Sequence, residues 1–136
     1  MPKDHGIGAS SKRREDVRFL TGRGRYTDDI NLRGQTHAVF VRSQVAHGRI
    51  RSIDTAAAEA MPGVLKVFTA KDFEGKGGVP CGWQIHDRQG KPMLEPKHPI
   101  LAEGKVRYVG DAIRSVVAET LEEARDAAEA VEVEIE

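Results

Sequence analysis

The sequence has one cysteine, few aromatic residues and no long hydrophobic run, and each shortage excludes a class of protein. Cys81 alone cannot form an internal disulfide, a four-cysteine iron–sulfur cluster or a cysteine-rich zinc site, and we expect it to be a buried small hydrophobe or an inert thiol. No apolar run approaches the roughly 20 residues that a bilayer-spanning helix needs. The basic amino-terminal segment lacks the apolar stretch of a secretory signal. For 136 residues we therefore expect one compact, cytoplasmic domain.

The charged residues are unevenly distributed, although the formal net charge is zero. A neutral chain has no overall field that would attract nucleic acid or an acidic substrate. Basic residues crowd positions 12–25, where Glu15 and Asp16 interrupt them, and the segment 119–136 is strongly acidic. The basic arm predicts either a solvated or partner-docking surface, which we favour, or a phosphate-binding segment.

The regular elements are expected from Thr36 onward, because residues 1–35 are polar and rich in Gly, Arg and Asp. We interpret 1–35 as an extended arm that lies on a surface, and 36–136 as the folded domain. β-Branched and aromatic residues predict strands at 37–43, 49–54, 64–69, 105–110 and 112–119. The first two are expected to pair as a hairpin, and the third to be buried on both faces.

Two helices are predicted within the domain. Thr55 is expected to cap a short helix that ends at Pro62 and Gly63. Thr120 and Glu123 form a capping-box pattern, which predicts the start of a longer helix.

The longer helix is expected to reach about residue 130 and to be followed by a strand. Its predicted buried face consists of Leu121, Ala124, Ala128 and Val131. Residues 131–136 strictly alternate between apolar residues and glutamate, which predicts a half-buried strand. The strand–helix–strand order predicts a βαβ-like unit beside antiparallel hairpins, and so an α+β fold.

The segment 74–104 holds four of the six prolines and several glycines, without a helix or strand period. Loops of this length usually have a functional or partner-docking cause. Its apolar side chains would need a neighbouring surface if they find no internal core. These residues are Trp83, Ile85, Met93, Leu94, Ile100 and Leu101.

Familiar site patterns are incomplete in this sequence. The segment 22–27, GRGRYT, lacks the third glycine of a dinucleotide-binding loop and does not lead into a predicted helix. Asp29, Asn31 and Gly34 fit three positions of a calcium loop, but Arg33 occupies a ligand position, so Asp29 is expected to make turn hydrogen bonds instead. We identify no catalytic, cofactor-binding or metal-binding residue, since no metal-ligand spacing joins the histidines at 5, 37, 47, 86 and 98.

Five segments in order along the chain closely resemble the start of the large subunit of the xanthine dehydrogenase, aldehyde oxidase and carbon monoxide dehydrogenase family. They are KRREDVRFLTGRGRYTDDINLRGQTHAVFVRS, GRIRSID, AMPGVLKVFTAKDF, HPILAEGKVRYVGDAI and VVAETLEEARDAAEAVEVEIE. The resemblance covers nearly the whole chain and is strongest to the bacterial carbon monoxide dehydrogenase branch.

The resemblance implies an a/b hammerhead domain, which is α+β with mixed or antiparallel strands. It implies no cofactor in this chain: molybdopterin cytosine dinucleotide is expected on the rest of the large subunit, and iron–sulfur clusters and FAD on partner subunits. It also implies that this chain is one part of an oxidoreductase and is inactive in isolation. The chain would then be either a truncated form of the large subunit or a separately encoded piece of it. The competing interpretation is a free-standing protein- or nucleic-acid-binding module that uses the basic arm.

Two positions depart from the family pattern. Gln44 and Val45 stand where the family commonly has Pro and His, and Arg114 and Ser115 replace small apolar residues. An arginine in a buried strand costs free energy unless it is paired. We therefore expect Arg114 to serve a partner contact, or the packing to have drifted from that of the complete enzyme.

Overall fold

The computed structural model describes residues 6–9 and 13–136, and it groups the chain into two units that divide between Gln35 and Thr36. The first unit contains a short helix, α1 (Asp16–Leu20), and a 3-10 turn, η1 (Thr27–Asp29), where the sequence predicted no helix. The rings of Phe19 and Tyr26 stack with centroids 5.4 Å apart. The Asp29 carboxylate accepts a hydrogen bond from the Tyr26 amide at 2.8 Å, which confirms its role in a turn.

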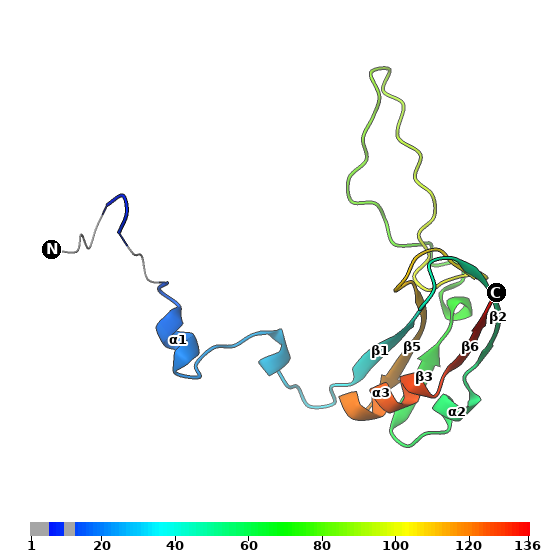
Figure 1. Ribbon diagram of the computed structural model, residues 1–136, viewed down its shortest axis with the longest axis horizontal. Helices are drawn as coiled ribbons and strands as arrows, with labels where there is room; N and C mark the ends of the chain where they lie inside the picture. Colours follow the sequence, from blue (N-terminus) through cyan, green and yellow to red (C-terminus); the bar gives the residue numbers. More distant parts are fainter. Residues whose placement is uncertain (1–5, 10–12) are drawn as a thin grey trace. The chain divides into compact units, whose positions relative to one another are not determined.

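Within the described residues, the second unit contains two antiparallel three-stranded sheets (Figure 1). The first sheet has the order β1 (His37–Arg42), β5 (Ala112–Ala118) and β3 (Val64–Phe68). The second has the order β4 (Lys105–Val106), β2 (Gly48–Asp54) and β6 (Glu132–Ile135). The helices are α2 (Ala56–Glu59), the 3-10 turn η2 (Ala70–Phe73) and α3 (Leu121–Glu129). The α+β prediction is confirmed.

The predicted hairpin between the first two strands is wrong. β1 pairs with β5, with His37 opposite Ala118, whereas β2 pairs with β4 and β6. The connection after β1 is held to the start of β5, since the Ser43 amide donates to the Asp111 carbonyl at 2.9 Å. The two strands therefore enter different sheets although they are neighbours in sequence.

The predicted βαβ-like unit is also wrong, because β5 and β6 flank α3 in sequence but lie in different sheets. The strand expected at 105–110 shortens to two residues. The Asp111 carboxylate accepts a hydrogen bond from the Arg107 amide at 2.9 Å, and Gly110 turns the chain at a φ of 88°. These two features replace strand pairing with a tight turn that leads into β5.

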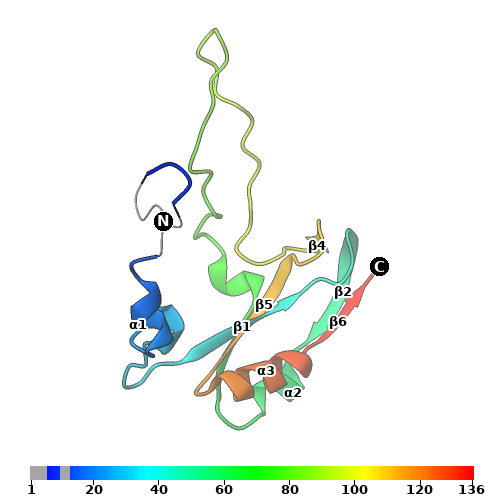
Figure 2. The same ribbon diagram turned by 60° about the vertical axis from the view of Figure 1, so that its left-hand side comes forward.

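Helix α3 carries the predicted capping box. The Thr120 hydroxyl accepts from the Glu123 amide at 3.2 Å, and the Glu123 carboxylate accepts from the Thr120 amide at 3.0 Å. Ala124 is fully buried as predicted, and so is Ala127, which the predicted face did not include. Small residues on this face let α3 lie close to the sheet of β1, β5 and β3 (Figure 2).

Two apolar clusters form the core of the second unit. The larger lies between α2, α3, β3 and β5 and contains Val67 and Val116, which are 2% and 0% exposed. The smaller contains Val106 and Ile113. Ile53 and Val133 pack against both clusters, so the sheet of β2 and β6 joins them.

The expected burial of the strand at 64–69 on both faces is wrong. β3 is an edge strand, and Leu65 is 52% exposed while Val67 faces the core. The apolar pattern could not show that this strand lies at the edge of its sheet, where part of it stays exposed.

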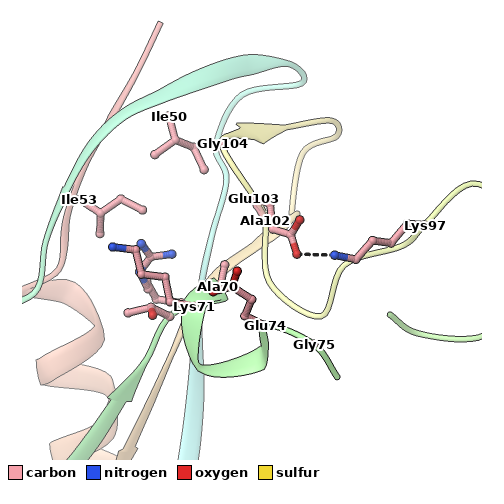
Figure 3. Close-up of a pocket in the computed structure, with 12 residues that line it drawn as sticks. Ile50, Ile53, Ala70, Lys71, Glu74, Gly75, Lys97, Ala102, Glu103 and Gly104 are labelled. Carbon is pink, nitrogen blue, oxygen red and sulfur yellow. Dashed lines mark hydrogen bonds and ion pairs between the residues drawn. The ribbon is translucent and has the colours of Figure 1, made fainter. Parts of the chain in front are cut away.

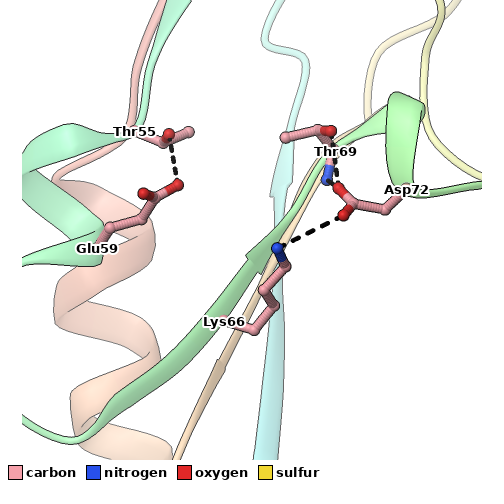
Figure 4. Close-up of polar contacts among 5 residues, drawn as sticks. All are labelled: Thr55, Glu59, Lys66, Thr69 and Asp72. Atoms are coloured by element: carbon pink, nitrogen blue, oxygen red, sulfur yellow. Dashed lines mark hydrogen bonds and ion pairs between the residues drawn. The ribbon is translucent and has the colours of Figure 1, made fainter.

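The cap of the short helix differs from the prediction. The Thr55 hydroxyl donates to the Glu59 carboxylate at 2.8 Å (Figure 4), and it does not accept from the backbone of α2. Asp54 fills that role, since its carboxylate accepts from the Ala56 amide at 2.9 Å. Gly63 follows the helix at a φ of 76°, a conformation that favours glycine.

Candidate docking ribbon and basic pocket

Residues 79–98 form a long antiparallel ribbon, called the 79–98 ribbon below. The Val79 amide donates to the His98 carbonyl at 2.8 Å near its base, and the Met93 amide donates to the Ile85 carbonyl at 2.9 Å further out. Figures 1 and 2 show this green-to-yellow segment projecting away from the two sheets. The sequence predicted a loop without a period here, and cross-strand hydrogen bonds give that loop a defined form.

A carboxylate braces the two sides of the ribbon. Glu95 accepts hydrogen bonds from the Cys81 amide at 2.9 Å and from the Gln84 side chain at 2.5 Å. These bonds, that from Cys81 first, lower the pKa of Glu95 below its ordinary value. The Cys81 thiol is exposed and donates to the Trp83 carbonyl at 3.2 Å. Of the two alternatives expected for Cys81, the buried small hydrophobe is therefore wrong, and the inert thiol stays a prediction.

The ribbon exposes several large apolar side chains. Leu94 is 89% exposed and Trp83 is 77% exposed, and the others are Val79, Ile85 and Met93. Large apolar side chains that stay exposed on a projecting segment are candidates for contact with a neighbouring surface. Ile100 and Leu101, which the sequence groups with this segment, do find an internal core. Leu101 is 2% exposed and Ile100 is half-buried, so they join the body of the domain.

A second feature is a pocket of about 640 Å³ beside the ribbon's base, called the basic pocket below (Figure 3). Apolar walls come from Ile50 and Ile53 of β2 and from Ala102, and the charged groups include Lys71, Glu74 and Arg114. At the rim, the Lys97 ammonium and the Glu103 carboxylate form an ion pair at 2.7 Å, so these two charges neutralise each other.

Arg114, the charged residue that the sequence places in an apolar strand, lies in this pocket. Its Nη1 donates to the Ile113 carbonyl at 2.6 Å, whereas its Nε is buried and has no hydrogen-bond partner among the described residues. Burial lowers the pKa of Arg114, and the Asp72 carboxylate partly opposes that effect. The guanidinium is therefore partly desolvated without a full set of partners.

Asp72 is already engaged by other groups (Figure 4). Its carboxylate accepts from the Thr69 amide at 2.7 Å and from the Thr69 hydroxyl at 2.8 Å, and it lies 3.5 Å from the Lys66 ammonium. The hydrogen bonds from Thr69 are the main cause that lowers the pKa of Asp72. Asp72 therefore attracts Arg114 from a distance but does not satisfy its Nε.

The histidines do not gather into a metal site. In the segments 6–9 and 13–136, no group of three or more His, Cys, Asp or Glu side chains could hold a metal ion. His98 lies 3.3 Å from the Tyr108 hydroxyl, and His86 pairs with Pro92 in the ribbon. His5 lies outside the described residues.

The basic arm is partly neutralised by its own acidic residues. Arg18 forms an ion pair with Glu15 at 3.0 Å and lies 5.1 Å from the centre of the Phe19 ring. Exposed pairs of this kind contribute little to stability, but they reduce the positive charge available to a phosphate.

Comparisons with known proteins identify the class to which this fold belongs. The family model described as aldehyde oxidase and xanthine dehydrogenase, a/b hammerhead domain, matches residues 21–136. The large subunit of nicotine 6-hydroxylase from Paenarthrobacter nicotinovorans is 45% identical over 96% of this chain and 15% of that subunit. The carbon monoxide dehydrogenase large chain of Afipia carboxidovorans is 39% identical over 98% of this chain and 16% of its own length.

Solved structures agree with this similarity. Quinoline 2-oxidoreductase from Pseudomonas putida 86 matches with a TM-score of 0.74 and 41% identity, over 96% of this chain and 16% of that chain. The domain is thus of the type found in the large subunits of molybdenum hydroxylases. The chain belongs to the a/b hammerhead domain family of aldehyde oxidase and xanthine dehydrogenase.

The resemblance seen in the sequence is therefore confirmed, and the comparisons give no support to the nucleic-acid-binding alternative. The chain spans about 15% of the length of the relatives that it matches. In the part of the chain that the structure describes, none of the helices has the length and apolar character to cross a membrane.

Proposed function

We propose that this chain supplies a structural module to a molybdenum hydroxylase large subunit and holds no redox group of its own. A similar Escherichia coli protein is a xanthine dehydrogenase molybdenum-binding subunit, 36% identical over 86% of this chain and 15% of that subunit. In this proposal, molybdopterin cytosine dinucleotide binds to the larger remainder of such a subunit. Iron–sulfur and flavin groups belong to partner subunits, and residues of this chain brace the cofactor domains.

Within that role, residues 36–136 act as the folded domain and residues 1–35 as an arm that lies along a neighbour. The grouping of the chain into units at this boundary supports the division. The family model begins at residue 21, so part of the arm is shared with relatives.

The 79–98 ribbon is the observation that carries the proposal. Its backbone hydrogen bonds order the segment in advance, so that docking costs less conformational entropy than ordering a flexible loop would. Leu94 and Trp83 expose most of their surface, and burying a large apolar side chain contributes about 1.5–3 kcal/mol. The ribbon therefore suits an apolar surface on a larger neighbour.

Affinity purification tests this proposal. The tagged chain is produced in a bacterium that assembles molybdenum hydroxylases, and the captured polypeptide is identified by mass spectrometry while molybdenum is measured in the same fraction. We expect a large-subunit polypeptide and molybdenum to be retained together. Retention of neither would contradict the proposal.

A matched pair of variants tests the ribbon itself. Leu94→Lys places a charge on the ribbon, and Leu65→Lys places the same charge on the exposed side of β3, where the leucine is 52% exposed. We expect Leu94→Lys to reduce capture at least about tenfold, which corresponds to 1.4 kcal/mol, and Leu65→Lys to leave it unchanged. Equal reductions of capture in the two variants would contradict a role of the ribbon in docking.

A further inference from the structure

We propose that the basic pocket binds a carboxylate side chain carried on an apolar segment of a partner polypeptide, with Arg114 as its anchor. This inference rests on the proposed function for the presence of a partner. The ligand chemistry is derived from the pocket alone.

The strand register places Arg114 on the core side of its sheet. Val39 pairs with Val116 and Val41 pairs with Arg114, before the irregularity that follows Val41. Residues two apart on a strand share a face, so Arg114 points to the same side as Val116, which is 0% exposed. A guanidinium on this side is costly unless an anion or a set of acceptors compensates its lost hydration.

Groups within the chain compensate Arg114 only in part. The Ile113 carbonyl accepts a hydrogen bond from Nη1 of Arg114. The Asp72 carboxylate is engaged by a hydrogen bond from Thr69 and an ion pair with Lys66. The buried Nε remains without a partner. Nε and the Nη2 beside it form the edge that a carboxylate binds through two parallel hydrogen bonds, and because Nε is buried, the Arg114 side chain must turn toward the pocket before both groups can donate.

The apolar walls of the pocket favour a ligand that has apolar groups beside its carboxylate. Ile50, Ile53 and Ala102 offer apolar contact, and a volume of about 640 Å³ exceeds the space that a single carboxylate fills. A phosphate would need donors around all of its oxygens, which these apolar walls do not supply. A carboxylate with apolar neighbours fits both parts of the pocket.

The remaining charges leave a net attraction for one anion. Lys97 and Glu103 neutralise each other at the rim. Lys71 and Arg114 are opposed by Glu74, so the lining carries one positive charge in excess. Glu74 repels a carboxylate, and this opposition favours a single acidic side chain over a cluster of them.

Peptide binding to the full chain tests the inference. The probes are N-acetyl-Leu-Glu-Leu-amide, the matching glutamine peptide and butyrate, and binding is followed by the arginine Nε–H resonances in nitrogen-labelled protein. We expect saturable binding of the glutamate peptide with a shift of the Arg114 Nε–H signal, and about tenfold weaker binding of the glutamine peptide. Equal affinities of the two peptides would overturn the inference.

Variants locate the binding in the pocket. Arg114→Met is expected to abolish the saturable shift, and Arg125→Met, on the exposed side of α3, is expected to leave it unchanged. Lys71→Met is expected to weaken binding and leaves strand β5 unchanged. It therefore tests the inference even if Arg114→Met fails to fold. Unchanged binding in both Arg114→Met and Lys71→Met would overturn it.

The source of the carboxylate is tested separately from the proposed function. Butyrate that binds as tightly as the glutamate peptide would overturn the assignment to a polypeptide partner. Peptide binding is measured on the chain alone, so it can fail while affinity purification of the molybdenum-containing partner succeeds, and the reverse also holds.

Discussion

The Glu95 carboxylate accepts a hydrogen bond from the Cys81 amide at 2.9 Å, and this bond joins the two sides of the 79–98 ribbon. Because Gln84 donates to the same carboxylate, one side chain braces the segment that exposes Leu94 and Trp83. A segment with three prolines and two glycines thereby has a defined form.

Removal of the brace should loosen the ribbon while the sheets remain intact. In Glu95→Ala we expect faster hydrogen exchange at the Cys81 and Met93 amides, with a melting temperature close to that of the unchanged chain. Glu122→Ala, on the exposed side of helix α3, is the control. Unchanged exchange at both amides would show that Glu95 does not order the ribbon.

Acidification should have the same local effect. The folded-state pKa of Glu95 lies below its ordinary value of 4.5 because Cys81 and Gln84 donate to the ionised form. This contribution is fully present above about pH 4.5 and is lost as the pH falls through the lowered pKa. Trp83 fluorescence should report that change below pH 4.5, and in Glu95→Ala this component should disappear.

The two threonines that precede helices should differ in their effect on stability. Thr120→Ala removes an acceptor for the Glu123 amide and is expected to cost about 1 kcal/mol of unfolding free energy. Thr55→Ala should cost less, because Asp54 caps α2 in its place. Urea unfolding measures both, and a larger loss in Thr55→Ala would contradict the assignment of Thr120 and Asp54 as the caps.

Gly63→Ala should destabilise the domain by more than backbone strain alone. At its φ of 76° an alanine costs about 1–2 kcal/mol. The added Cβ would also collide with the Glu123 carboxylate that caps α3. Gly110→Ala separates the two effects, since Gly110 has a φ of 88° with no atom near its Cβ position. Equal losses in the two variants would exclude the collision.

The unpartnered Nε of Arg114 should limit the stability of the isolated chain. Arg114→Met keeps most of the side-chain volume and removes the buried Nε, so we expect unfolding free energy to stay equal or to rise by up to about 2 kcal/mol. Arg125→Met should have no effect. A clear loss of stability in Arg114→Met would show that its present contacts already compensate its burial.

Local patterns in the sequence predicted local structure well. The capping box at Thr120 and Glu123, the strand of β5 and the alternation in β6 depend on residues close in sequence, and the structure confirms them. The pairing of β1 with β5 depends on residues far apart, so the preference for neighbouring strands to pair was misleading.

The candidate sites were only partly predictable. Arg114 stood out because a charge is unusual in an apolar strand, but its unpartnered Nε requires the positions of Ile113 and Asp72. The apolar residues of the ribbon could be recognised in the sequence. The ribbon is ordered by backbone hydrogen bonds such as that from the Met93 amide to the Ile85 carbonyl, and such bonds produce no periodic pattern in the sequence.

Hydrogen exchange of the 79–98 ribbon, with and without the captured molybdenum-containing large-subunit polypeptide, tests the central claim most directly. We predict that protection of the ribbon amides rises on binding, while amides of α2 stay unchanged. A stable complex in which the ribbon exchanges as fast as in the free chain would contradict the claim that this segment docks the domain to its larger neighbour.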